Sequence, residues 1–294
     1  MNIMHMLVKM ADEWFLQYIV DNLANVLIFY YICNYKCNRI YVSNIYGRLY
    51  QKFRIIRKKI VYDFRLGYGG IGDNLRYFMY ILDTSMKNNK RVYYKKNNIE
   101  TEKYIKLKYD IMYIDDAMIN QLHGVDVVIP QMFYAYVDYL DYSINLNEVF
   151  YFTDEVKINS KHLFPQDITS YISIHLRLGD RHLETDGNYV VCKDDERKFS
   201  EEKIHKFIEE NYNENIFFCC DNNSYKLKLK EKYNNIIITN CDVGHTSLSN
   251  TTEKQILDAI TEFYILTNSK MIFAASTSGF SILASKFNNT PLIK

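Results

Sequence analysis

Three polar residues stand at the end of a largely apolar run in the segment YISIHLRLGD, residues 171–180. Its first part, 171–176, is dominated by apolar, aromatic and β-branched residues, which predicts a buried strand. His175, Arg177 and Asp180 lie at or just beyond the carboxyl end of this strand, where ligands bind in an open α/β sheet. An arginine offers a phosphate a planar fork of donors that no other side chain provides. The segment therefore predicts a phosphate site with Arg177 as its principal ligand, whereas Asp180 is expected to orient Arg177 or its own loop.

Two more loops with polar side chains follow predicted strands in the same half of the chain. The sequence DNN, which begins at Asp221, follows a strand predicted at 215–220, and STSGFS, 276–281, follows one at 270–275 and opens a helix. A helix N-terminus rich in hydroxyl groups favours a phosphate, although serine and threonine are also ordinary helix caps. Because the carboxyl ends of parallel strands share one edge of a sheet, we expect these loops to converge on one ligand.

A glycine-rich turn, GYGGIG at 67–72, lies between a predicted strand at 59–64 and a predicted helix at 73–87. Glycines at a helix N-terminus let backbone N–H groups approach an anion closely. The spacing fits neither a Walker loop nor the GxGxxG pattern, so a plain tight turn is as compatible with it as a ligand contact. Asp73 is correspondingly either a site residue or a cap of the helix.

The alternation of predicted strands and helices indicates parallel α/β sheets, because crossover helices join parallel strands. The remaining predicted strands lie at 91–94, 125–130 and 236–240, and the remaining helices at 200–211, 224–233, 252–268 and 280–287. The sequence thus predicts two α/β halves, joined by a linker at 159–170 that contains Pro165.

The predicted division has three parts: a helical N-terminal extension at 1–58, a Rossmann-like domain at 59–164 and a second Rossmann-like domain at 165–294. Of the 294 residues 48% are hydrophobic, which predicts folded domains with sizeable cores. The near balance of 36 basic against 35 acidic side chains gives no support to a nucleic-acid partner. The six cysteines are too few and too scattered for a disulfide scaffold, so buried thiols and a cytoplasmic location are expected.

The N-terminal segment WFLQYIVDNLANVLIFYYIC, residues 14–33, is the candidate for a membrane contact. Asp21 and two asparagines interrupt it, and the uninterrupted part, 26–33, is far shorter than the about 20 residues that span a bilayer. A packed helix is therefore expected rather than a membrane span. Basic side chains follow at 48–59, so peripheral contact of 14–59 with an anionic membrane is the alternative to a solvated basic face.

Four segments resemble motifs of fucosyltransferases with the GT-B fold, especially the alpha-1,2-fucosyltransferases. HLRLGD looks like their His-x-Arg-x-Gly-Asp motif, and GGIGDNLR followed by a helix and the strand RVYY resembles their Gly-Gly-x-Gly-Asn-Gln segment. FFCCDNN resembles their strand ending in Ser-Asp-Asp, and EFYILTNSKMIFAASTSGFS resembles their closing helix, strand and Ser-x-Phe-Ser turn. The resemblance runs from about residue 60 to the end of the chain.

The chain also departs from this pattern. Asp73 stands where the family has Asn, Gly279 looks like an insertion, and the Trp-Trp-Gly-Ala segment that often follows the last motif is absent. These departures put the acceptor and the sugar in doubt more than the fold and the donor site.

The resemblance implies a GT-B fold, in which two Rossmann-like domains face each other across a cleft, and a GDP-fucose donor held mainly by the C-terminal half. Arg177 would bind the diphosphate and His175 the guanosine. Glu262 would read the edge of the guanine, with Asp258 as the alternative. The other implied donor-binding residues are Gly70, Gly72, Asp221, Ser278, Phe280 and Ser281.

The implied reaction is transfer of fucose, with inversion, from GDP-fucose to a hydroxyl group of a glycan or protein. Departure of the nucleoside diphosphate builds negative charge, which preorganised donors must stabilise. No convincing Asp-x-Asp motif of a metal-dependent transferase occurs in the sequence, so neither a metal nor another cofactor is expected. Asp73, Glu184 and Asp186 are the candidate bases for the acceptor hydroxyl. The alternatives are transfer from another nucleotide sugar and a catalytically inactive nucleotide- or carbohydrate-binding protein of the same fold.

Overall fold

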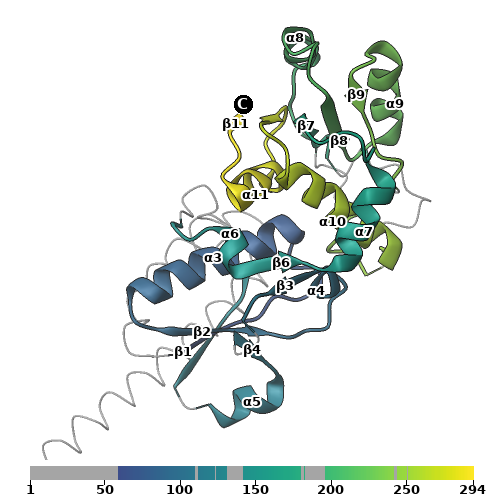
Figure 1. The fold of residues 1–294 in the computed structure, drawn as a ribbon. Coiled ribbons are helices and arrows are strands. Elements are labelled where there is room, and N and C mark those ends of the chain that lie inside the picture. The colour runs from purple at the N-terminus through teal and green to yellow at the C-terminus, as the bar shows by residue number, and fades with distance from the viewer. Residues whose placement is uncertain are drawn as a thin grey trace, which may run out of the picture. The chain divides into compact units, whose positions relative to one another are not determined.

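The computed structural model describes residues 59–109, 112–122, 124–130, 142–179, 182, 196–241, 244–249 and 251–294. These residues belong to one compact unit, Phe53–Lys294, whose elements are drawn in Figure 1. The helical extension predicted at 1–58 and, except for Lys59, the membrane contact predicted for 14–59 lie outside the described residues. Among the helices of the described ranges, none is both long and apolar enough to cross a bilayer.

The first parallel sheet has the strand order β4-β2-β1-β5. Its strands are β1 (Lys59–Tyr62), β2 (Arg91–Lys95), β4 (Tyr113–Ile114) and β5 (Val125–Val128). β1 pairs in parallel with both β2 and β5, and its residues 60–62 are buried. A strand of this kind reads as a continuous apolar run, which is why the sequence predicts it. The helix α3 (Ile71–Lys87) provides the crossover from β1 to β2.

The second parallel sheet has the strand order β11-β10-β7-β8-β9. Its strands are β7 (Ile172–Leu176), β8 (Ile216–Cys220), β9 (Ile236–Ile237), β10 (Ile272–Ala274) and β11 (Leu292–Ile293). Every residue of β7 and β8 is buried. The chain order reverses between β7 and β10, and ligands usually bind at such a switch point. The predicted α/β class with two parallel sheets is confirmed.

The helices of the second half begin at side-chain caps that are visible in the sequence. These helices are α8 (Glu201–Glu210), α9 (Asn223–Lys232), α10 (Glu253–Thr267) and α11 (Gly279–Asn288). Ser200, Asn222 and Ser278 each accept a hydrogen bond from a backbone N–H of the helix that follows. Thr252 and Gln255 form a reciprocal capping box at the start of α10. Because these caps depend on neighbouring residues alone, the predicted helix ends are nearly correct.

The structure differs from the prediction where the sequence was expected to form a linker. The helix α7 (Asp154–Leu163) occupies the first part of 159–170. Its acidic first turn and basic last turn complement the helix dipole. Val156 is its one buried residue, so the helix needs no apolar stripe that the sequence could reveal. Asn159 donates hydrogen bonds to Asp258 (3.2 Å) and Thr261 (2.9 Å) of α10, so α7 packs against the second half. The domain boundary between 164 and 165 stays a prediction.

Several short elements were not predicted. They are the antiparallel strands β3 (Ile105–Leu107) and β6 (Phe150–Phe152), the strands β4 and β11, and the helices α4 (Thr101–Tyr104), α5 (Asp116–Gln121) and α6 (Leu146–Val149). Segments of this length contain too few residues to show a periodic apolar pattern.

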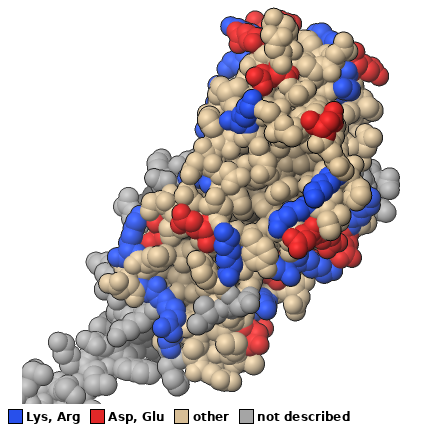
Figure 2. All heavy atoms as spheres, in the orientation of Figure 1, with Lys and Arg blue, Asp and Glu red and all other residues tan. Residues whose placement is uncertain are grey.

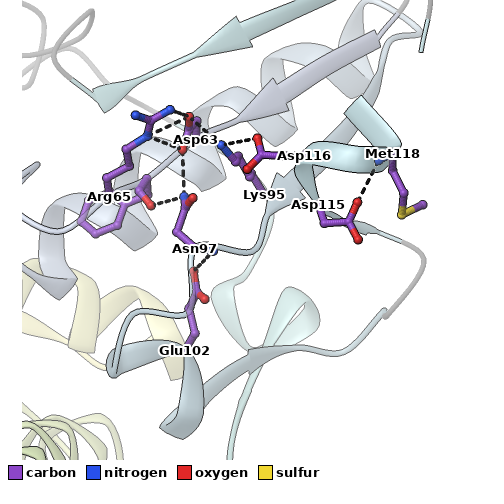
Figure 3. A network of polar contacts seen from close by, with 9 residues as sticks. Asp63, Arg65, Lys95, Asn97, Glu102, Asp115, Asp116 and Met118 are labelled. Atoms are coloured by element: carbon purple, nitrogen blue, oxygen red, sulfur yellow. Dashed lines mark hydrogen bonds and ion pairs between the residues drawn. The ribbon is translucent and has the colours of Figure 1, made fainter. Parts of the chain in front are cut away.

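Polar side chains form a network of hydrogen bonds and ion pairs at the carboxyl end of the first sheet, as Figure 3 shows. Asp63, which is 1% exposed, accepts hydrogen bonds from Arg65 (2.6 Å) and Asn97 (2.8 Å). Lys95 lies 3.5 Å from Asp63 and 2.8 Å from Asp116. Burial by itself would raise the pKa of Asp63, but these hydrogen bonds and charges outweigh burial and lower it. The network therefore holds the chain at the start of the loop that leads to the glycine-rich turn.

The face of the molecule drawn in Figure 2 carries basic and acidic side chains interspersed. Exposed ion pairs of the described residues include Lys103–Glu253 (2.8 Å) and Lys157–Asp154 (2.9 Å). Exposed pairs of this kind contribute little to stability, because water and salt screen them.

Candidate functional site

One cavity of about 600 Å3 is lined by residues of both halves. The first turns of α3 and α11 line it through residues 70–73 and 278–280, and Figure 1 draws these helices next to each other. A Cβ atom on Gly72 would lie 3.4 Å from the carbonyl carbon of Gly279, an ordinary contact distance, so the first turns of the two helices lie close together. Two adjacent helix N-termini bring backbone N–H groups and positive dipole ends to one space, which favours an anion there.

A loop of the second half meets the glycine-rich turn beside this cavity. The Thr246 hydroxyl accepts a hydrogen bond from the backbone N–H of Ile71 (3.1 Å), and the N–H of Gly67 donates to the carbonyl of Ser247 (3.0 Å). Gly70, which caps α3, lies against the same threonine. Residues 244–246 line the cavity, although no motif in the sequence indicated this loop.

Arg177 lies at the switch point between β7 and β10 and lines the cavity. Its Nη1 is 2.8 Å from Oδ2 of Asp221, which follows β8. The Asp221 carboxylate also accepts hydrogen bonds from the backbone N–H groups of Leu178 (2.8 Å) and Gly179 (3.2 Å). Ser276, after β10, exchanges hydrogen bonds with the N–H and carbonyl of Arg177. The three strand-end loops therefore converge as expected, and Asp221 orients Arg177 and its loop.

Two arginines that the sequence did not single out also line the cavity, Arg76 and Arg197. Arg76 extends from α3, and its Nη2 is 3.9 Å from Oδ1 of Asp73. The backbone N–H of Arg197 donates to the carbonyl of Leu178 (2.8 Å), which places this residue beside the loop of Arg177. Three guanidinium groups thus surround one cavity, and guanidinium is the side-chain group best matched to phosphate.

His175 is buried within the cavity wall and is 5% exposed. Its ring stacks on Phe280 at a centroid distance of 5.2 Å, and Phe280 packs edge-on against Phe263 at 4.9 Å. Its Nδ1 is buried, with no hydrogen-bond partner among the described residues. Burial, and then the charge of Arg177, lowers the pKa of His175 to about 3. The imidazole is therefore neutral at neutral pH, and its ring forms part of the cavity wall.

The stability of the protein is expected to depend on pH through His175. Below about pH 6.5 the unfolded chain takes up a proton at this residue, whereas the folded chain does not until the pH nears 3. The unfolding free energy should therefore fall by up to about 1.4 kcal/mol per pH unit in this range, and His175→Gln should lack this contribution. Urea denaturation between pH 4.5 and 7.5 measures both slopes. His162→Gln, at an exposed position of α7, is the control. Equal slopes for all three proteins would contradict the assignment.

Asp73 lines the cavity near Arg76. Its Oδ2 accepts a hydrogen bond from the N–H of Gly70 (3.2 Å), so Asp73 caps α3 and faces the cavity as well. Burial raises the pKa of Asp73, and the charge of Arg76 and the Gly70 hydrogen bond offset part of the rise. A carboxylate with a raised pKa is a better base than an ordinary aspartate. The other candidate bases, Glu184 and Asp186, lie outside the described residues, as does Asp180.

Some of the remaining predicted site residues line the cavity and others do not. Glu262 of α10 lines the cavity, whereas Asp258, the alternative, is not among the lining residues and accepts hydrogen bonds from Asn159 of α7. Ser278 lines the cavity and caps α11. Ser281 is completely buried, is not among the lining residues, and donates a hydrogen bond to the carbonyl of Ser278 (3.2 Å). Within the described residues, no group of three or more His, Cys, Asp or Glu side chains is placed to hold a metal ion.

No model of a known protein family and no curated protein sequence matches the chain. Solved structures do match it. The fucosyltransferase NodZ from Bradyrhizobium aligns with a TM-score of 0.51 and 13% identity, over 78% of this chain and 93% of that one. NodZ alpha-1,6-fucosyltransferase co-crystallized with GDP aligns at 0.50 and 13%, over 78% and 92%. The same enzyme soaked with GDP-fucose aligns at 0.50 and 12%, over 79% and 93%. The chain therefore shares the α/β fold of these structures, with two parallel sheets in the GT-B arrangement.

Proposed function

We propose that this protein is an inverting, metal-independent glycosyltransferase that transfers fucose from GDP-fucose to a hydroxyl group of a glycan or protein. The observation that carries the proposal is one cavity lined by three arginines, two helix N-termini and the buried carboxylate of Glu262. The volume of about 600 Å3 lies in the range of small-molecule sites. The matched structures support the choice of donor, because one is NodZ co-crystallized with GDP and another is NodZ soaked with GDP-fucose.

The proposed chemistry assigns a task to each group of residues. Arg177, Arg76 and Arg197, with the first turns of α3 and α11, stabilise the negative charge that builds on the departing diphosphate. Because these groups supply positive charge already, we expect no divalent cation to be required. Neutral His175, stacked on Phe280, contacts the nucleoside part of the donor through its ring. Asp73 accepts the proton of the acceptor hydroxyl as this oxygen attacks the sugar.

The donor nucleotide can be tested by thermal stability. GDP should stabilise the protein more than UDP, dTDP or ADP at the same concentration, because a ligand that binds the folded state alone raises the unfolding free energy. The gain is about 2.7 kcal/mol at a hundredfold excess over Kd. Differential scanning calorimetry with each nucleotide makes the comparison. Greater stabilisation by UDP or dTDP would contradict a GDP-linked donor and favour a different nucleotide sugar.

Turnover can be tested with GDP-fucose and GDP-mannose as donors, by following release of GDP in buffer that contains EDTA. We expect release from GDP-fucose, with or without added acceptor sugars, to persist in EDTA. A strict requirement for manganese would contradict the metal-independent mechanism. Tight GDP binding without hydrolysis or transfer across a panel of sugar and peptide acceptors would instead support the catalytically inactive alternative.

A further inference from the structure

Lys226 of α9 is one of the largest fully buried side chains of the described residues, at 1% exposure. Its Nζ lies 2.6 Å from Oε1 of Glu262, which is 4% exposed. The hydroxyl of Thr239, just after β9, donates a hydrogen bond to the same oxygen. A lysine is almost never completely buried without a partner, and an ion pair this deep is costly to desolvate. Stability alone therefore does not explain why this ion pair is buried.

The pairing leaves the two oxygens of Glu262 in different positions. Oε1 is anchored by Lys226 and Thr239, whereas Oε2 has, among the described residues, the thiol of Cys219 as its hydrogen-bond partner at 3.6 Å. Glu262, Cys219 and Ala259 line the main cavity, and Lys226 and Thr239 line a separate cavity behind it. The anchored carboxylate can thus offer Oε2 to a ligand in the main cavity.

The titratable groups near Glu262 come from several elements. Burial raises the pKa of the thiols of Cys219 and Cys220 on β8, and of Cys241 after β9, so these groups are uncharged at neutral pH. Burial by itself lowers the pKa of Lys226, but the attraction of Glu262 outweighs burial and raises it, so the ammonium stays charged. Lys226 is therefore the positive charge that balances Glu262.

We propose that Lys226 is a positioning residue for nucleobase selectivity: it holds the Glu262 carboxylate in place through Oε1, so that Oε2 can accept hydrogen bonds from a base with adjacent N–H donors. This inference rests on the proposed function and deepens it. Guanine presents N–H donors at N1 and at its 2-amino group, whereas adenine presents an acceptor at N1, which an ionised carboxylate repels. Without the ammonium, Oε1 would keep only the Thr239 hydroxyl of these two partners, and the carboxyl group would lose the contact that fixes its orientation toward the base.

The test is calorimetric binding of GDP, IDP and ADP to the wild-type chain and to Lys226→Met. In wild type we expect the affinities to fall in the order GDP, IDP, ADP. In Lys226→Met the preference for GDP over ADP should fall by about tenfold to a hundredfold at pH 7. Lys228→Met is the matched control, at a 67% exposed lysine of the same helix.

The outcomes separate this inference from the proposed function. If the wild-type chain does not bind GDP, the proposed function itself fails. If the wild type binds GDP and Lys226→Met weakens the binding of GDP and ADP equally, Lys226 is merely structural and the inference is overturned. If Lys226→Met does not fold, Lys226→Gln decides, because glutamine keeps a polar side chain beside Glu262 but carries no charge. A preference for GDP over ADP that falls by tenfold or more supports the inference, and an unchanged preference overturns it.

Discussion

Arg177→Lys is expected to lower kcat/KM for GDP-fucose by at least ~10²-fold. The guanidinium binds Asp221 through Nη1 at 2.8 Å, and its side chain remains 19% exposed at the cavity, where its planar fork can bind a diphosphate. An ammonium is a compact charge that cannot hold both partners in this planar geometry. If it pairs with Asp221, the phosphate loses its ligand. If it turns to the phosphate, a buried carboxylate loses its partner.

The measurement is steady-state transfer kinetics, with GDP affinity determined on the same samples. Arg65→Lys is the matched control, because Arg65 also pairs with an aspartate at the end of a central strand, yet is 55% exposed and is not among the residues that line the cavity. Its kcat/KM should stay within about twofold of wild type, because a lysine at this exposed position can still pair with Asp63, and neither residue lines the cavity. Near-normal activity of Arg177→Lys would remove Arg177 from its proposed role at the diphosphate.

Asp73→Asn is expected to lower kcat by ~10²- to 10⁴-fold while leaving GDP affinity nearly unchanged, because asparagine cannot accept the acceptor proton. In the wild-type enzyme the ionised carboxylate is the active form, so kcat/KM should fall as the pH drops through the pKa of Asp73. Because burial raises this pKa above the ordinary 3.8, the fall should begin at a higher pH than for an exposed aspartate. The residual activity of the variant should lack this acidic limb.

The capping role of Asp73 must be separated from the proposed catalytic role. Asparagine can accept the Gly70 hydrogen bond through its amide oxygen, so the melting temperature of Asp73→Asn should stay close to wild type. Asp73→Ala removes the cap as well and should lower the melting temperature. A kcat for Asp73→Asn within tenfold of wild type would contradict the assignment and leave Glu184 and Asp186 as candidate bases.

The sequence by itself determined the elements on which the candidate site stands. β7 and β8 are buried along their whole length, so they had to be apolar runs that are recognisable without a structure. The helices after them begin at Ser200, Asn222, Thr252 and Ser278, whose caps depend on residues a few positions away. Since parallel strands share a carboxyl edge, the convergence of His175, Arg177 and Asp221 also followed from their places after strands.

The tertiary structure alone decided which other side chains line the cavity beside His175 and Arg177. Arg76 reaches the cavity because α3 packs against α11. Arg197 reaches it because its N–H bonds to the loop after β7 and nearby Phe199 forms an isolated β-bridge with Ser276. α9 reads NSYKLKLKEK, in which Lys226 and Lys228 look equivalent. Packing on the second sheet buries Lys226 against Glu262 and leaves Lys228 67% exposed. Contacts between residues this distant in sequence depend on how the elements pack, and no local pattern specifies that packing.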